Sequence, residues 1–242
     1  LHTGTVGRAG RPAVADSSVM RPEPDATPPV IVYGNDVLCG WCFATGPAIA
    51  EARRRLGDEV RWRIECGGLV VGERVRPVGA DREYLIAGLA QVEMLSGRRA
   101  GSAYIERVLD VGTWVSDSEP ACRAVLTAQD MAPKSAIDFS HWLTDALYLD
   151  GRVPDDPDVL REAAAANGID GDELVARWSG EEAQAQTSAA FQRARALGVT
   201  TYPSLFLQRE GYLVPLLAGY APAEEIESVV RRALVESSAA RR

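Results

Sequence analysis

Two cysteines stand where an apolar segment of this chain gives way to a helical pattern, in the stretch VIVYGNDVLCGWCFATGPAIAEARRRL of residues 30–56. The β-branched and aromatic residues that begin this stretch predict a buried strand. From Cys42 onward, apolar residues recur at the spacing of one helical face until Gly57 ends the pattern. A strand that passes directly into a helix favours a layered α/β fold, with Cys39 and Cys42 at the junction. The pair is then half of a metal site, a redox couple, or two small buried apolar residues.

The rest of the pattern places a helical block between segments that contain strands. Residues 59–66 alternate apolar and charged side chains, as a half-exposed strand does, so the chain opens as a βαβ unit. Helical periodicity then dominates from about residue 80 to 180. Segments 203–208 and 211–218 predict an antiparallel hairpin, and 222–236 predicts a final helix. This order predicts an α/β fold: a thioredoxin-like βαβ…ββα core with a large all-helical insertion domain.

The same order gives the expected domain bounds. The core is expected to comprise residues 29–79 and 190–236, and the helical insertion residues 80–189. Residues 1–28 are rich in Pro, Gly, Ala and Ser without periodicity, so they are expected to form a disordered or extraneous tail. Residues 237–242 are polar and are expected to fray.

Several residues predict where elements begin, end or bend. Pro157 predicts a helix start, because proline is favoured at the first helical position. Ser179 and Glu182 have the spacing of a capping box, and Ser118 is expected to cap another helix. Pro215 predicts that the second hairpin strand is an edge strand or carries a bulge.

The charge balance narrows the expected partners. The 26 basic and 34 acidic side chains give a net charge of -8, which argues against nucleic acid or an anionic membrane as the main partner. The sequence has no apolar run of membrane-spanning length, and its first residues lack an apolar secretory core. The cytoplasm is the expected compartment, where a cysteine pair is more often catalytic or metal-binding than a structural disulfide.

A structural zinc site does not fit the remaining residues. Such a site takes four Cys or His ligands, usually as two close pairs. Cys66 and Cys122 are isolated in the sequence, His2 lies near the first residue, and His141 falls on a predicted helix, where we expect no catalytic task. We therefore expect no metal. Cys66 and Cys122 are predicted to be buried apolar residues, with a second redox pair as the alternative.

A redox couple fits the position of Cys39 and Cys42. The amide donors and positive dipole end of a helix N-terminus favour a thiolate over a thiol. Cys39 is expected at that end and exposed, and Cys42 one turn inside and more buried. An exposed thiolate can attack a disulfide, and the second thiol can resolve the mixed disulfide.

The segment Thr201-Tyr202-Pro203 supports the same interpretation. Pro203 opens a predicted strand, and X–Pro bonds are where cis peptides occur. A cis bond would leave the backbone of Tyr202 free to pair with an extended substrate beside the cysteines. The alternative is an ordinary trans proline at the start of an edge strand.

Four motifs carry a resemblance to a known family. DVLCGWCFA, GGLVVGERVRP, SDSEPACRAV and ALGVTTYPSLFL occur in the order seen in bacterial DsbA-like thioredoxin-fold oxidoreductases. The chain most resembles the FrnE-like cytoplasmic branch of predicted protein-disulfide isomerases, with 2-hydroxychromene-2-carboxylate isomerase and kappa-class glutathione transferase as relatives. The resemblance covers about residues 30–236. It implies that Cys39 is the nucleophile, Cys42 the resolving thiol and Pro203 the cis-proline of a substrate-binding loop with Thr201 and Tyr202.

The chain departs from this family between its cysteines. Gly40 and Trp41 stand where the periplasmic oxidant has Pro-His, and tryptophan offers neither charge nor acceptor to the Cys39 thiolate. We therefore expect a less strongly oxidising couple. The isomerase and transferase relatives generally lack the paired cysteines, so keeping both argues for redox chemistry.

Roles for the residues beside the pair are less determined. Asp36 could relay protons for Cys42 or tune the thiolate, and it could equally be a capping acid at the strand end. Gly40 and Trp41 could contact substrate, with Trp41 at the surface and Phe43 packed inward. The helix start at 116–122 could bind a carboxylate of glutathione, although simple capping is the stronger interpretation.

The sequence thus predicts a thiol–disulfide oxidoreductase of the disulfide exchange or isomerase type, acting on protein or small-molecule thiols and disulfides. It needs no metal or organic cofactor, and glutathione is a candidate co-substrate. One alternative is a glutathione-dependent isomerase or transferase on the same fold. Another is a non-enzymatic binding module with idle cysteines.

Overall fold

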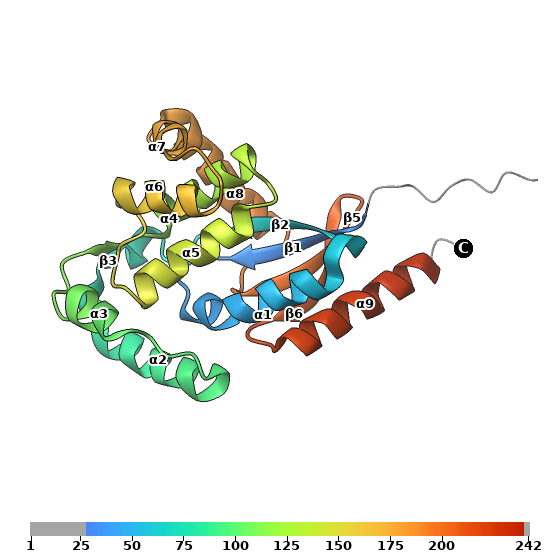
Figure 1. Cartoon of the computed structure of the whole chain (residues 1–242), viewed down its shortest axis with the longest axis horizontal. Helices are drawn as coiled ribbons and strands as arrows, with labels where there is room; N and C mark the ends of the chain where they lie inside the picture. The colour runs from blue at the N-terminus through green and yellow to red at the C-terminus, as the bar shows by residue number, and fades with distance from the viewer. Residues whose placement is uncertain (1–27, 240–242) are drawn as a thin grey trace, which may run out of the picture.

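Four strands form the central sheet of the computed structural model, which describes residues 28–239 (Figure 1). Their order is β2-β1-β5-β6. β1 (Val30–Asn35) runs parallel to β2 (Arg61–Cys66) and antiparallel to β5 (Ser204–Arg209), and β6 (Tyr212–Ala218) pairs antiparallel with β5 at the edge. The predicted βαβ unit and hairpin are confirmed. The expectations for residues 1–27 and 240–242 fall outside the described residues.

Both faces of this sheet are covered. Consecutive strand residues point to opposite sides, and in β1 the residues on both sides are buried. Tyr33 lies in the core on the side of α1 (Gly40–Leu56) and α9 (Ala223–Ala239), which pack side by side (Figure 1). Val32 points the other way, into a second apolar cluster that includes part of α8 (Glu181–Ala196). A strand buried on both faces explains why VIVY reads as an uninterrupted apolar run.

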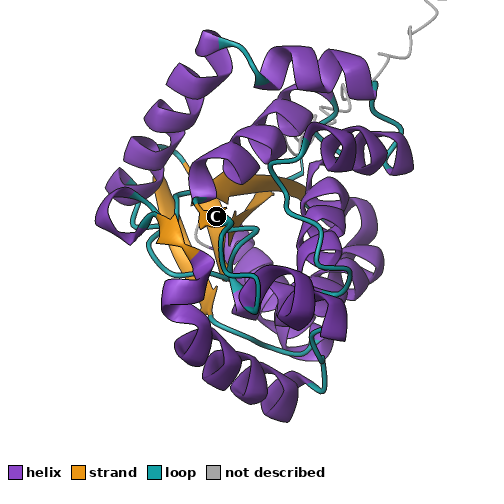
Figure 2. Ribbon diagram, turned by 90° about the vertical axis from the view of Figure 1, so that its left-hand side faces the viewer, coloured by secondary structure: helices purple, strands orange, loops and turns teal. Residues whose placement is uncertain are grey.

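The segment between β2 and β5 is mainly helical, and helices flank the strands on several sides in Figure 2. Its helices are α2 (Arg82–Ser96), α3 (Ser102–Tyr104) with a π-helical turn at Ile105–Leu109, α4 (Ser118–Met131), α5 (Ala136–Tyr148), α6 (Pro157–Ala166), α7 (Gly171–Trp178) and α8.

Two additional strands and three short turns complete the described chain. β3 (Arg76–Pro77) pairs antiparallel with β4 (Val115–Ser116), so the predicted insertion is not purely helical. A two-residue ladder is too short to produce a recognisable alternation in sequence, which is why the pattern did not predict it. The 3₁₀ turns are η1 (Gly57–Glu59), η2 (Gly72–Arg74) and η3 (Val78–Asp81).

Helix starts agree with some local predictions and correct others. Pro157 begins α6, whose Asp156 side chain accepts a hydrogen bond from the Asp158 amide at 2.8 Å, as the proline predicted. The predicted capping box at the start of α8 is wrong. That helix begins one residue after Gly180, which is its N-cap, and the Ser179 hydroxyl donates back to the Ala176 carbonyl at the end of α7.

Two other boundaries differ from the expectation. Asp117, not Ser118, caps α4, by accepting a hydrogen bond from the Glu119 amide at 2.9 Å. The last helix continues to Ala239, where fraying was expected from residue 237. Pro215 does lie in the edge strand, beside a register shift that marks a bulge, as predicted.

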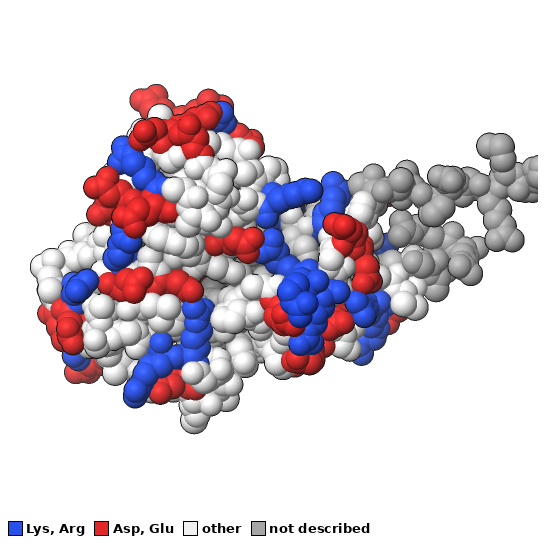
Figure 3. Space-filling model, in the orientation of Figure 1, with Lys and Arg blue, Asp and Glu red and all other residues white. Residues whose placement is uncertain are grey.

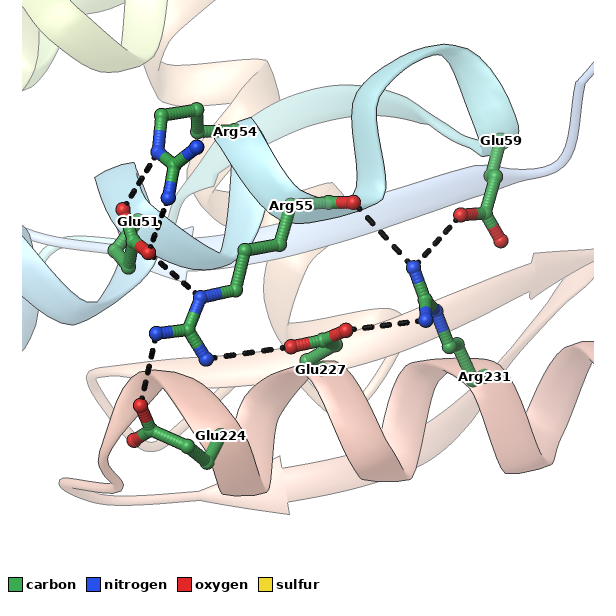
Figure 4. A network of polar contacts seen from close by, with 7 residues as sticks. All are labelled: Glu51, Arg54, Arg55, Glu59, Glu224, Glu227 and Arg231. Carbon is green, nitrogen blue, oxygen red and sulfur yellow. Dashed lines mark hydrogen bonds and ion pairs between the residues drawn. The ribbon is translucent and has the colours of Figure 1, made fainter.

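A chain of ion pairs joins α1 to α9 at the surface (Figure 4). Arg55 donates to Glu51 within α1 at 2.6 Å and reaches Glu224 on α9 at 2.9 Å. Glu227 lies between Arg55 at 3.4 Å and Arg231 at 3.1 Å. Because these side chains are at least partly exposed to solvent, their main effect is to fix how α9 lies on α1, and they stabilise the fold only slightly.

Charges of both signs are interspersed over the face drawn in Figure 3. Within residues 28–239, no helix combines the length and hydropathy that a membrane span requires. No group of three or more His, Cys, Asp or Glu residues in that same range could hold a metal ion.

Candidate active site

Cys39 is the N-cap of α1, and Cys42 lies in its first turn. The Cys39 amide donates to the Asp36 carbonyl at 3.1 Å, which closes the turn between β1 and the helix. The helix thus begins directly after Cys39, which lies at its N-terminal end as expected. Cys42 is 1% exposed, as expected, but Cys39 is only 5% exposed, so the prediction of an exposed first cysteine is wrong.

An apolar cluster explains the burial of Cys39. Tyr202 belongs to the same cluster as both cysteines, and Trp41 and Leu69 pack against it. Trp41 is therefore half-buried rather than fully at the surface. Phe43 is fully buried, as expected, with its ring 4.9 Å from that of Tyr148.

The two thiols differ in acidity. The pKa of Cys39 lies below its ordinary value, mainly because the Cys42 thiol donates a hydrogen bond to its sulfur and because backbone amides at the helix start add to this. Burial raises the pKa of Cys42, and the neighbouring Cys39 raises it further. The geometry can therefore support one thiolate at the helix N-terminus and one protonated thiol behind it.

The Tyr202–Pro203 segment meets the cysteines across 163 positions of sequence. The Cys39 thiol donates to the Tyr202 carbonyl at 3.4 Å, and the Tyr202–Pro203 peptide bond is cis. The Tyr202 side chain packs on Gly67, where a Cβ atom would overlap its hydroxyl group. Thr201 is exposed beside it.

Asp36 is fully buried and accepts hydrogen bonds from three segments of the chain. The amides of Leu38 and Leu69 donate to it at 2.9 and 2.7 Å. The Ser118 hydroxyl donates at 3.0 Å, and the Cys122 thiol donates at 3.6 Å. Burial raises the pKa of this carboxyl group, whereas these hydrogen bonds lower it.

Gly40 is closely surrounded by residues of the insertion. A Cβ atom there would lie 3.8 Å from Val92 and 3.9 Å from Leu89, both on α2, and 3.9 Å from the Tyr148 hydroxyl. That hydroxyl donates to the Leu38 carbonyl at 2.7 Å, directly before the first cysteine. The insertion therefore supports the cysteine loop from one side.

Three residues that contact the site could not be identified from the sequence. Ser118 looked like a helix cap, Cys122 like an isolated apolar residue, and Tyr148 carried no signal of its own. The start of α4 is also less suited to an anionic ligand than expected, because the buried Asp36 carboxylate already accepts the Ser118 hydrogen bond. His141 packs against Gly46 and Tyr33.

The family model described as DSBA-like thioredoxin domain matches residues 104–230. That span includes most of the insertion and the Tyr202–Pro203 segment, but not the cysteine pair. Among curated protein sequences none matches the chain.

Solved structures resemble the whole described fold. A provisionally assigned protein disulfide isomerase from Nitrosomonas europaea has a TM-score of 0.73 at 22% identity, covering 86% of this chain and 98% of its own. The cytosolic disulfide reductase DsbM from Pseudomonas aeruginosa has a TM-score of 0.67 at 26% identity, covering 88% and 100%. A DsbM structure with GSH scores 0.65 at 25% identity, covering 86% of this chain and 98% of that one.

Proposed function

The chain belongs to the family of DSBA-like thioredoxin domains, and on this premise we propose that Cys39 and Cys42 carry out thiol–disulfide exchange. The observation that carries the proposal is the asymmetric pair of thiols at the start of α1, with the Tyr202 carbonyl 3.4 Å from Cys39. A lowered pKa makes Cys39 the nucleophile, because the thiolate is the attacking form.

The proposed reaction has two exchange steps. The Cys39 thiolate attacks one sulfur of a substrate disulfide, forms a mixed disulfide and releases the other sulfur as a thiolate. Cys42 then loses its proton and attacks Cys39, which releases the second substrate thiolate. Two electrons pass to the substrate, and the enzyme keeps a Cys39–Cys42 disulfide. The reverse sequence oxidises a dithiol.

Residues around the pair receive roles in the same proposal. The backbone of Tyr202, with Thr201 and Pro203, offers hydrogen-bonding groups to an extended substrate beside Cys39. Gly40 and Trp41, both partly exposed, are proposed to touch the substrate.

For Asp36 the proposed role is to tune the thiols rather than to relay protons. A carboxylate has about four lone-pair sites. Four donors already fill those of Asp36, so none is left for the proton of Cys42.

We further propose that the enzyme works in the cytoplasm as a reductase or isomerase, with glutathione as the thiol that restores the reduced state. The likeness to a cytosolic disulfide reductase, which has also been solved with GSH, supports this. The lack of a cationic side chain between the cysteines supports it as well, because Gly40 and Trp41 add no positive charge that would stabilise the Cys39 thiolate and make the couple strongly oxidising.

Insulin reduction with glutathione tests the proposal. Cys39→Ser should abolish turnover, and Cys42→Ser should accumulate a mixed disulfide that mass spectrometry detects as a substrate adduct. Cys66→Ala is the matched control, because it removes a buried thiol that lies in a different apolar cluster from the pair. Equal turnover in the wild type and Cys39→Ser would reject the proposed chemistry. Glutathione binding that survives loss of both cysteines would favour the isomerase or transferase alternative.

A further inference from the structure

Helix α4 lies outside the thioredoxin-like core and yet supplies two of the four hydrogen bonds to Asp36, from Ser118 and Cys122. We propose that Ser118 and Cys122 are positioning residues that hold Asp36 as a buried carboxylate beside the cysteine pair, so that the helical insertion sets the redox poise of Cys39–Cys42. The inference rests on the proposed function, and it adds that residues of α4 influence the redox equilibrium of the two cysteines.

The direction of three of the four hydrogen bonds is fixed by the groups that make them, and Cys122, which also has Cys66 as a hydrogen-bond partner, is the weakest donor of the four. The amides of Leu38 and Leu69 can only donate. The Ser118 hydroxyl accepts from the Val70 amide at 2.9 Å, so its own proton is directed to Asp36 at 3.0 Å. Ser118 thereby links the loop after β2 to the loop before Cys39.

The four donors favour the ionised form of Asp36. Oδ1 receives Leu38 and Ser118, and Oδ2 receives Leu69 and Cys122. A proton on either oxygen would face a donor, and that hydrogen bond would be lost. Hydrogen bonds to a charged acceptor are stronger than those to a neutral one, so the network opposes the effect of burial.

A negative charge at this position acts on both catalytic thiols. Asp36 raises the pKa of Cys39 and of Cys42, because a nearby carboxylate disfavours a second negative charge. A less stable thiolate means a less stable reduced form, and the couple becomes a weaker oxidant. This gives the insertion a physical means of making the enzyme a reductant.

The surroundings make Asp36 a clean group to titrate at acid pH. Among the titratable groups that interact with it, Cys42, Cys122, Tyr148 and Tyr202 have raised pKa values and lose their protons at higher pH, and the Cys39 thiol, whose pKa is lowered, is distinguished by labelling aspartate alone. The Asp36 pKa can therefore be followed by carbon-13 NMR of labelled aspartate in the reduced protein.

The test measures the Asp36 pKa in variants that remove a hydrogen-bond donor to Asp36 and in variants that keep it. Ser118→Ala and Cys122→Ala should each raise the Asp36 pKa, by about one to two units for the hydroxyl and less for the weaker thiol donor. Cys122→Ser keeps a donor and should leave the pKa near its wild-type value. Thr127→Ala is the matched control, because its hydroxyl bonds only to the Arg123 carbonyl within α4 and does not reach Asp36.

The redox readout is the equilibrium of each variant with glutathione. Asp36→Asn should shift the Cys39–Cys42 equilibrium constant about tenfold toward the dithiol, equivalent to about 30 mV. In Ser118→Ala the acid inflection in the pH dependence of that constant should move with the Asp36 pKa. An Asp36 titration that is the same in the wild type, Ser118→Ala and Cys122→Ala overturns the inference. A pair that never exchanges with glutathione defeats the proposed function instead, and the carboxylate titration still decides the positioning role.

Discussion

A methyl group added at Gly67 would occupy the place of the Tyr202 hydroxyl. In Gly67→Ala the new Cβ would overlap that hydroxyl, lie 3.1 Å from Cζ of the same ring and 3.2 Å from Cβ of Ala194. The Tyr202 ring must therefore move, and its movement displaces the Tyr202 backbone, which lies beside Cys39. Overpacking of this kind costs about 1–3 kcal/mol of unfolding free energy.

The expected loss of activity follows from the same displacement. The Tyr202 carbonyl lies 3.4 Å from the Cys39 sulfur, so a shift of about 1 Å disturbs both the thiol and the proposed substrate backbone site. We expect kcat/KM for insulin reduction to fall about 10- to 100-fold in Gly67→Ala. Urea unfolding, followed by far-UV circular dichroism, measures the accompanying loss of stability.

The double variant separates this steric cause from a general loss of packing. Tyr202→Phe removes the hydroxyl that clashes, and it loses only the hydrogen bond to the Val199 carbonyl at 3.3 Å, worth about 1 kcal/mol. In Gly67→Ala/Tyr202→Phe the stability should exceed the additive expectation by about 1–2 kcal/mol, and much of the activity should return. Single-variant costs that simply add would refute the reasoning.

Two further changes probe the buried and the exposed polar groups. Burial lowers the pKa of His141 to about 4, so as pH falls from 6.5 to 4 the unfolded chain takes up a proton that the folded chain does not, and up to about 3 kcal/mol of stability is lost. His141→Leu should not show this loss between pH 7 and 4, and parallel stability curves for the two proteins would contradict the assignment. Glu227→Gln removes the Arg55–Glu227 pair between α1 and α9 and the Arg231–Glu227 pair within α9. Because both pairs are partly exposed, we expect the Tm to fall by less than about 4 °C, and the variant and wild-type Tm to agree in 1 M salt. A larger fall that persists at high salt would mean that Glu227 contributes by packing.

The order of strands and helices could be predicted because it depends on local periodicity and on breaking residues. VIVY at β1, the Pro157 start of α6 and the bulge near Pro215 each follow from the shape and hydrogen-bonding capacity of a few neighbouring residues. The ends of helices were harder, because adjacent side chains compete for the same amides. Asp117 takes the capping role and frees Ser118 for a distant partner, and the spacing of Ser179 and Glu182 could not show that Ser179 finishes the helix before α8.

The sequence by itself determined where the two thiols of the proposed reaction lie. The two thiols lie at a strand–helix junction, and the residues that form this strand and helix are neighbours in the sequence. What only the tertiary structure decided is the environment of those thiols. Cys39 is buried by Tyr202 and Leu69, and Asp36 is held by Ser118 and Cys122, all from segments far along the chain. Solvation and charge at a thiol depend on whatever packs within a few ångströms, and no local pattern records which distant residues those will be.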